Sequence, residues 1–125
     1  MNTQELRIGN YVNLINRWNE KELLIIKGIS FRGNVYDIDD NIYGLDNYEP
    51  IPLTEEWLLR FGFDIDINPI VSEKVYVKYL RDKRTQSIEI GIDMEFYNGI
   101  YSQKISHVNQ LQNLYFALTG EELTP

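Results

Sequence analysis

The sequence predicts an α+β fold: a small N-terminal antiparallel sheet of the barrel-like, SH3-like kind, a short connecting helix, and a C-terminal antiparallel β-meander packed with a C-terminal helix. Three observations lead to this prediction. Short β-rich runs separated by turn residues fill the chain up to residue 53. A capped helix signal follows directly, and beyond it a period-two pattern gives way to a helical one. We therefore expect two lobes, residues 1–53 and 54–125, or one continuous domain.

The N-terminal lobe is expected to hold four short strands, each rich in β-branched, aromatic or leucine residues. Glycines and the run Asp39-Asp40-Asn41 separate the strands, because these residues tolerate a positive φ or hydrogen-bond their own backbone. Several short strands at such close spacing are typical of a strongly bent sheet or barrel. The expected strands are residues 11–15, 23–29, 34–38 and 41–45.

The helix expected at residues 54–61 has the clearest local signal. Thr54 is a suitable N-cap, and the two glutamates after it lie where the helix dipole favours negative charge. Leu53, just before the cap, is placed to pack on Leu58 as a hydrophobic staple. Gly62 is expected to end the helix in a left-handed conformation. Two turns are too few for stability in isolation, so we expect Trp57 to be held by tertiary packing.

The meander is expected to begin with the alternating run 63–67 and to continue with strands at 74–80 and 87–97. In the last of these, apolar residues alternate with acids or glycine over nine positions, from Ile88 to Phe96, which predicts one long half-buried strand. Asn98-Gly99 is a strong hairpin signal, so residues 100–105 should return as the next strand.

The C-terminal helix is expected from His107 to Leu118, capped by Ser106 and stopped at Gly120. Its apolar residues recur at helical spacing on one face. We expect that face to cover the apolar side of the meander. Its members are Val108, Leu111, Leu114, Tyr115 and Leu118.

The composition excludes several kinds of chemistry. The 125 residues include no cysteine and one histidine, His107, so disulfides, thiol nucleophiles, zinc ribbons and paired-imidazole metal sites are not expected. We predict no cofactor. The sequence shows neither a signal-peptide pattern nor an apolar stretch near the roughly 20 residues that a membrane span needs, so the expected location is the cytoplasm, without membrane contact.

Charge is distributed unevenly along the chain. The net charge of −7 disfavours general binding to a nucleic-acid backbone. Residues 37–66 contain nine acids and one base, whereas residues 74–84 contain five bases and one acid. The basic stretch is either a solvated hairpin, which is the favoured interpretation, or a contact for phosphate groups.

No catalytic or metal-binding constellation is recognised. Counted as a calcium loop, the acidic run that begins at Asp37 puts Ile42 where glycine is required, so it is interpreted as a solvated turn. The acids Glu89, Asp93 and Glu95 are interpreted as the solvated face of a strand, because no partner base lies nearby. We therefore name no catalytic residue and no metal ligand.

Two places are candidates for partner contacts. Trp18 lies in a polar loop, where its ring either folds back as a lid on the sheet, the favoured interpretation, or faces a partner. The basic stretch interleaves tyrosines with cations, the composition of a strand that grips phosphates and stacks bases. Its candidate residues are Tyr76, Lys78, Tyr79, Arg81, Lys83 and Arg84.

Three segments carry a resemblance to a known family: Glu5-Leu6-Arg7-Ile8-Gly9-Asn10-Tyr11-Val12, the run from Pro50-Ile51-Pro52 to Gly62-Phe63, and the run from Gln110-Leu111-Gln112 to Leu123. Together they resemble a family of short proteins without assigned activity, found in Bacteroidetes genomes and in their prophages and phages. The likeness spans nearly the whole chain. It implies a small accessory protein of mobile elements that acts by binding.

The sequence thus favours a non-enzymatic module that acts through contacts with another protein or with a second copy of itself. One alternative is a nucleic-acid-associated protein that uses the basic stretch 74–84, or a nucleic-acid mimic that uses the acidic stretch 37–66. An enzyme that relies on carboxylates alone is the least favoured alternative.

Overall fold

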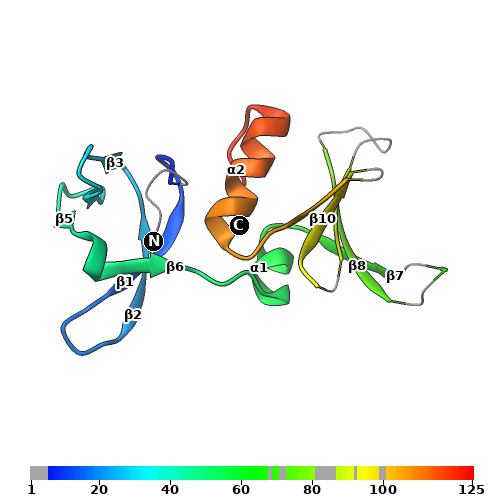
Figure 1. Ribbon diagram of the computed structural model, residues 1–125, viewed down its shortest axis with the longest axis horizontal. Coiled ribbons are helices and arrows are strands. Elements are labelled where there is room, and N and C mark those ends of the chain that lie inside the picture. Colours follow the sequence, from blue (N-terminus) through cyan, green and yellow to red (C-terminus); the bar gives the residue numbers. More distant parts are fainter. Residues whose placement is uncertain (1–5, 68, 71–72, 81–86, 92, 99–100) are drawn as a thin grey trace. The chain divides into compact units, whose positions relative to one another are not determined.

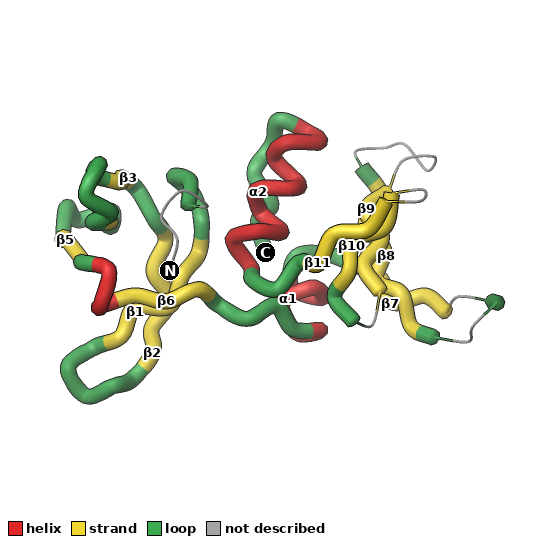
Figure 2. The backbone as a smooth tube through the Cα atoms, in the orientation of Figure 1, coloured by secondary structure: helices red, strands yellow, loops and turns green. Residues whose placement is uncertain are grey.

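The computed structural model describes residues 6–67, 69–70, 73–80, 87–91, 93–98 and 101–125. Within this part of the chain the fold is mixed α+β, as predicted, with three small antiparallel sheets and two α-helices (Figures 1 and 2). The described strands form open sheets and close no barrel. The chain divides into two units, Met1–Pro52 with His107–Glu122, and Leu53–Ser106 with Leu123–Pro125.

The main sheet of the first unit has the strand order β2-β1-β6. Its strands are β1 (Tyr11–Ile15), which matches the prediction at both ends, β2 (Lys21–Ile25) and β6 (Tyr48–Pro50). Strand β6 was not predicted, because its proline and glutamate give it little of the composition that marks a strand. In the observed register, Val12 pairs with Leu24 on one side and with Pro50 on the other.

A second sheet of the first unit has the order β3-β4-β5 and two residues in each strand. The strands are β3 (Gly28–Ile29), β4 (Val35–Tyr36) and β5 (Ile42–Tyr43), followed by a short 3-10 helix, η2 (Leu45–Asn47). The expected strand 23–29 is therefore divided: its first part pairs with β1 and its second part with β4. The N–H of Lys27 donates to the C=O of Tyr36 at 2.8 Å and links the two parts.

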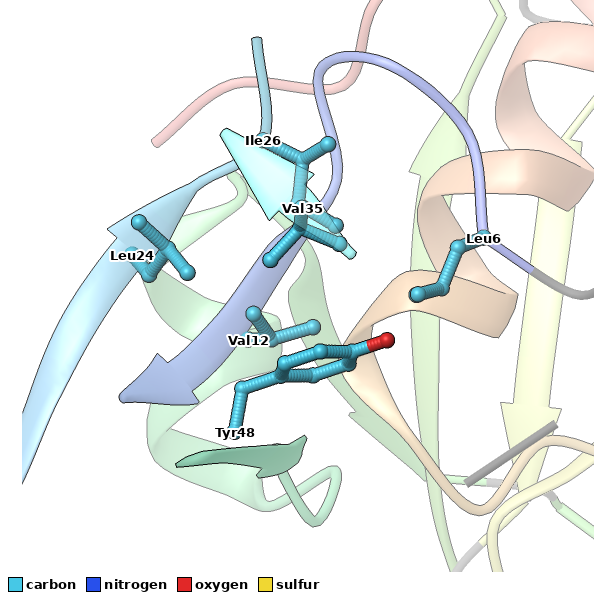
Figure 3. Packing of buried hydrophobic residues seen from close by; sticks show 6 residues of the cluster. All are labelled: Leu6, Val12, Leu24, Ile26, Val35 and Tyr48. Atoms are coloured by element: carbon cyan, nitrogen blue, oxygen red, sulfur yellow. The ribbon is translucent and has the colours of Figure 1, made fainter. Parts of the chain in front are cut away.

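The core of the first unit lies between these two sheets (Figure 3). Its buried members come from both sheets, from the segment before β1 and from the link between β2 and β3: Leu6, Val12, Leu24, Ile26, Val35 and Tyr48. The hydroxyl of Tyr48 donates to the C=O of Gly33 at 2.8 Å, so the one polar group of this cluster is satisfied. Each buried aliphatic side chain stabilises the unit by about 1.5–3 kcal/mol relative to exposure.

The second unit begins with the predicted helix, α1 (Glu55–Arg60). The Oγ1 atom of Thr54 accepts from the N–H of Trp57 at 3.4 Å, so the predicted cap is confirmed. Gly62 has φ +87° and donates its N–H to the C=O of Leu59, which confirms the predicted stop. Trp57 is half-buried, as the packing argument expected.

The sheet of the second unit has the order β11-β10-β9-β8-β7. The prediction of one long strand at residues 87–97 is wrong. The chain turns after Gly91, and Met94, at φ +62°, donates its N–H to the C=O of Gly91. Ile90 then pairs with Phe96, so the alternation continues through the turn and mimics a single strand. The strands are β7 (Asp64–Ile67), β8 (Lys74–Tyr79), β9 (Ser87–Gly91), β10 (Glu95–Asn98) and β11 (Tyr101–Lys104).

The hairpin expected near Asn98 is present, since β10 and β11 pair from Glu95 with Lys104 to Asn98 with Tyr101. The turn residues 99–100 lie outside the described residues, and so does the polar loop 81–86 between β8 and β9.

The final helix, α2 (Val108–Thr119), ends at Gly120 (φ +73°) as predicted, but its N-cap is His107 rather than Ser106. The side chain of Gln110 accepts from the N–H of His107 at 3.1 Å and completes this end. The helix belongs to the first unit, not to a C-terminal lobe of residues 54–125. The helix packs on β1, and its Gln112 and Asn113 side chains hydrogen-bond to Gly9 and Asn10 in the segment before β1. Helical periodicity identified Val108, Leu111 and Tyr115 as buried, but Leu118 is 49% exposed, so the predicted face is correct only in part. It did not identify the surface in the first unit on which the helix packs.

Candidate functional site

A hollow of about 410 Å³ lies in the first unit, between strand β2 and the segment from β4 to β5. Four consecutive residues of β2 line it, which means that the hollow faces the edge of the strand rather than one of its sides. Its walls are Leu14, Glu22–Ile25, Lys27, Asp37, Ile38 and Tyr43.

Strand β2 is the edge of its sheet among the described residues. The N–H of Ile26 donates to the C=O of Asn10 at 2.9 Å, towards β1, whereas the N–H of Lys27 donates to Tyr36 on the other side. Backbone groups alternate in direction along a strand. The N–H and C=O groups of Leu23 and Ile25 therefore point away from β1, along the free edge and towards the hollow.

The side chains of β2 leave much apolar surface in contact with water. Leu23 is 49% exposed and Ile25 36% exposed, and Ile38, across the hollow, is 77% exposed. The register places Leu23 and Ile25 on the sheet side of Asn13 and Tyr11, opposite to the core side that holds Leu24. An edge strand with exposed apolar side chains and a hollow next to it is a typical attachment site for another strand.

Asp37 gives the opposite wall of the hollow a fixed negative charge. Its Oδ1 atom accepts from the N–H groups of Asp39 and Asn41, and its Oδ2 atom accepts from the Asn41 amide and the Tyr43 hydroxyl, all at 2.9–3.0 Å. The side-chain hydrogen bond from Asn41 contributes most to holding the pKa of Asp37 below its ordinary value. Burial, and then the bond to Asp37, raise the pKa of Tyr43, so its hydroxyl stays protonated and keeps donating.

Two other sheet edges, β6 and β7, are protected in ways that β2 is not. Strand β6 is three residues long and ends in Pro50, which has no N–H to offer. Strand β7 carries two aspartates, and the side chain of Asp66 accepts from the N–H of Ile67 at 2.8 Å. Acidic side chains, proline and short length are the usual means by which sheet edges avoid pairing. Strand β2 has five residues and none of these protections beyond Lys21 and Glu22 at its start.

The described part of the basic stretch is used inside the second unit. Tyr76 is buried, and its hydroxyl donates to Glu55 of α1 at 3.2 Å. Lys78 donates to the C=O of Phe61 at 2.9 Å, and Lys74 forms an ion pair with Glu55 at 3.6 Å. These three residues alternate along β8 and share the face that meets α1. They hold α1 on the sheet and do not form a basic-aromatic contact surface.

Of the remaining candidates, Tyr79 is half-exposed on the opposite face of β8. Arg81, Lys83 and Arg84 lie outside the described residues. Trp18 is 66% exposed, so its interpretation as a lid on the sheet is wrong, and the Arg17 guanidinium stacks on its ring at 4.2 Å.

Sequence reasoning did not identify the hollow or the β2 edge. The run Leu23-Leu24-Ile25 carries the available signal, because three apolar residues in succession cannot all face one core from a strand. Asp37 and its turn were recognised, but not as one wall of a cavity. The contribution of Tyr43 to that wall depends on the pairing of β4 with β5, which composition does not specify.

Among the described residues, no group of three or more histidine, aspartate or glutamate side chains is placed to hold a metal ion. No helix in the described part of the chain is long and apolar enough to cross a membrane. Comparisons of the chain with protein-family models, with curated proteins and with solved structures give no match. The functional assignment therefore depends on the residues and geometry of this chain.

Proposed function

We propose that this protein is a non-enzymatic interaction module that binds an extended segment of a partner protein by adding it as a strand along β2. One observation carries the proposal: the five-residue edge strand β2, with three apolar residues in succession, faces a hollow of about 410 Å³, while the β6 and β7 edges are protected. Strand addition is a common mode of peptide recognition in which main-chain hydrogen bonds supply affinity and side-chain pockets supply specificity.

The edge offers backbone partners in the spacing that an added strand requires. Leu23 and Ile25 lie two residues apart and each presents one N–H and one C=O on the free side. A bound strand can extend along β2 until it meets Tyr36, whose C=O already accepts from Lys27. The site therefore accommodates about five residues, or roughly 17 Å of extended chain.

The proposal also includes the biological context of the protein and its location in the cell. The resemblance of the opening, central and closing segments to a Bacteroidetes prophage family supports an accessory role in a mobile element. A small acidic chain that acts by holding a peptide of another protein fits that role, and we place it in the cytoplasm.

The proposal is tested by a pair of variants at one position. Leu23→Pro removes an N–H that points to the free edge, whereas Leu23→Ala removes most of the same side chain and keeps that N–H. Peptides are selected on the wild-type protein from a random-sequence phage display library and then synthesised. Their site is mapped by NMR shifts of the Leu23 and Ile25 amides.

We expect selected peptides to shift these two amides, and Leu23→Pro to weaken binding about tenfold or more while Leu23→Ala weakens it less. Urea unfolding of each variant verifies that the sheet is intact. The proposal is contradicted if no selected peptide perturbs β2, or if a folded Leu23→Pro variant binds as tightly as Leu23→Ala.

A further inference from the structure

We infer that the segment bound along β2 is basic, with aliphatic side chains on one face and lysine or arginine on the other. This inference depends on the proposed function, because it describes the occupant of the same edge. It follows from the different surroundings that the two faces of an added strand would meet.

One face of the added strand would meet aliphatic side chains. A residue opposite Leu23 or Ile25 projects its side chain to the same side of the sheet as they do. Both are partly exposed, at 49% and 36%, and they are two residues apart on one face. Aliphatic or β-branched side chains opposite them would cover this surface, because aliphatic pairs between neighbouring strands stabilise a sheet.

The other face would meet carboxylates around an apolar centre. Leu24 lies there beside Leu14, on the core side of the sheet, with Glu22 two residues before it on the same face. Asp37 lies in the facing wall, directly after Tyr36 and so towards the Lys27 end of the hollow. A bound strand thus meets one carboxylate near each end, and a cation at either end is favoured over an acid.

The charge of the whole unit acts in the same direction. Its two segments, Met1–Pro52 and His107–Glu122, contain five arginines and lysines and ten aspartates and glutamates, a net charge of −5 with histidine neutral. Among the described residues that line the hollow, Lys27 is the one cation, and it lies at the Asp37 end. Discrimination by charge is therefore expected to depend most on Glu22.

Two synthetic peptides provide the test. One has the core Lys-Val-Val-Val-Lys and the other Glu-Val-Val-Val-Glu, each between glycine-serine tails. Both cores read the same in either direction, so the result does not depend on whether the strand adds parallel or antiparallel. Binding is followed by NMR shifts of the Leu23 and Ile25 amides in the wild type, in Glu22→Lys and in Asp46→Lys. Asp46 is exposed in η2 and does not line the hollow, so it is a matched charge-reversal control.

We expect the lysine peptide to bind the wild type at least about threefold more tightly than the glutamate peptide at low salt. Glu22→Lys should abolish or reverse this preference, and Asp46→Lys should preserve most of it. Equal binding of both peptides at β2 would overturn the basic character and leave strand addition standing. Failure of both peptides to shift either amide, in a protein that still binds library-selected peptides there, would also overturn it. Failure of every peptide would instead reject the proposed function, and this inference with it.

Discussion

The side-chain oxygen of Gln112, in the final helix, accepts a hydrogen bond from the backbone N–H of Tyr11 at 2.8 Å. The same side chain donates to the C=O of Gly9 at 3.2 Å. Gln112 is almost fully buried, so these two bonds satisfy both ends of a polar group away from water. Residues 101 positions apart are thereby joined, and α2 is held against the start of β1 within the first unit.

Gln112→Ala should therefore lower the free energy of unfolding by about 2–4 kcal/mol, because it leaves the Tyr11 N–H without its partner and opens a cavity. Gln110→Ala is the control on the same helix: its side chain accepts from the N–H of His107 and is only half-buried, so about 1 kcal/mol is expected. Urea unfolding measures both. An equal loss of unfolding free energy in both variants would show that the Gln112 side chain stabilises the protein no more than the Gln110 side chain does.

The alternation of backbone groups along β2 predicts a difference between two adjacent exposed positions. The N–H of Glu22 points to β1 and that of Leu23 points away, so proline at 22 breaks the ladder while proline at 23 does not. We expect Glu22→Pro to cost about 3 kcal/mol or more and Leu23→Pro clearly less. Urea unfolding measures the free energy of both variants. A larger loss in Leu23→Pro than in Glu22→Pro would mean that the free edge has been assigned to the wrong residues.

Two glycines give opposite expectations for alanine. Gly62 has φ +87°, and a Cβ there would lie 3.0 Å from the Nζ atom of Lys78, so Gly62→Ala should destabilise by about 1–2 kcal/mol. Gly44 has φ −79° and room for a Cβ, so Gly44→Ala should be neutral or slightly stabilising. Thermal unfolding of both variants provides the comparison, and a loss at Gly44 as large as at Gly62 would contradict the role of φ.

The hydrogen bonds of Asp37 predict that the stability of its turn depends on pH. Its hydrogen bonds, that from the Asn41 side chain first, lower its pKa below the ordinary 3.8, so ionised Asp37 stabilises the turn above that pH. This stabilisation is lost as the pH falls through the lowered pKa. Asn41→Ala removes the Asn41 side-chain contribution, and the pKa of Asp37 should then rise towards its ordinary value. Carboxyl-carbon NMR titration of the wild type and the variant measures the shift. An unchanged titration midpoint would rule out the Asn41 side chain as the main cause.

The wall of the hollow also predicts a local effect of Tyr43→Phe. The change removes the donor to Asp37 and preserves the ring, so the pKa of Asp37 should rise slightly while the first unit stays folded. The same NMR titration reports the shift, and far-UV circular dichroism verifies the fold. A fall in the pKa of Asp37 would contradict the assigned hydrogen bond.

Several elements could be predicted from the sequence because their causes are local. Thr54 and Gly62 bound α1 through a cap and a left-handed stop, both of which depend on residues within a few positions. Strand β1 was predicted at both ends, and Gly120 was predicted as the end of α2. The chemistry of such positions depends on φ and on the nearest backbone groups, so no distant partner is needed to recognise them.

The tertiary structure decided what lies next to what. A single strand and two strands joined by a turn can show the same alternation of apolar and polar residues, provided that the turn leaves the apolar side chains on the same face of the sheet. Only the strand pairing shows that Ile90 lies opposite Phe96. A helical stripe shows that α2 buries a face, but the hydrogen bonds of Gln112 to Gly9 and Tyr11 show where. The candidate site has the same origin. The amides of Leu23 and Ile25 form a free edge because β1 occupies one side of β2 and the chain turns away from the other side at Asp37, an arrangement set by contacts that composition and periodicity do not contain.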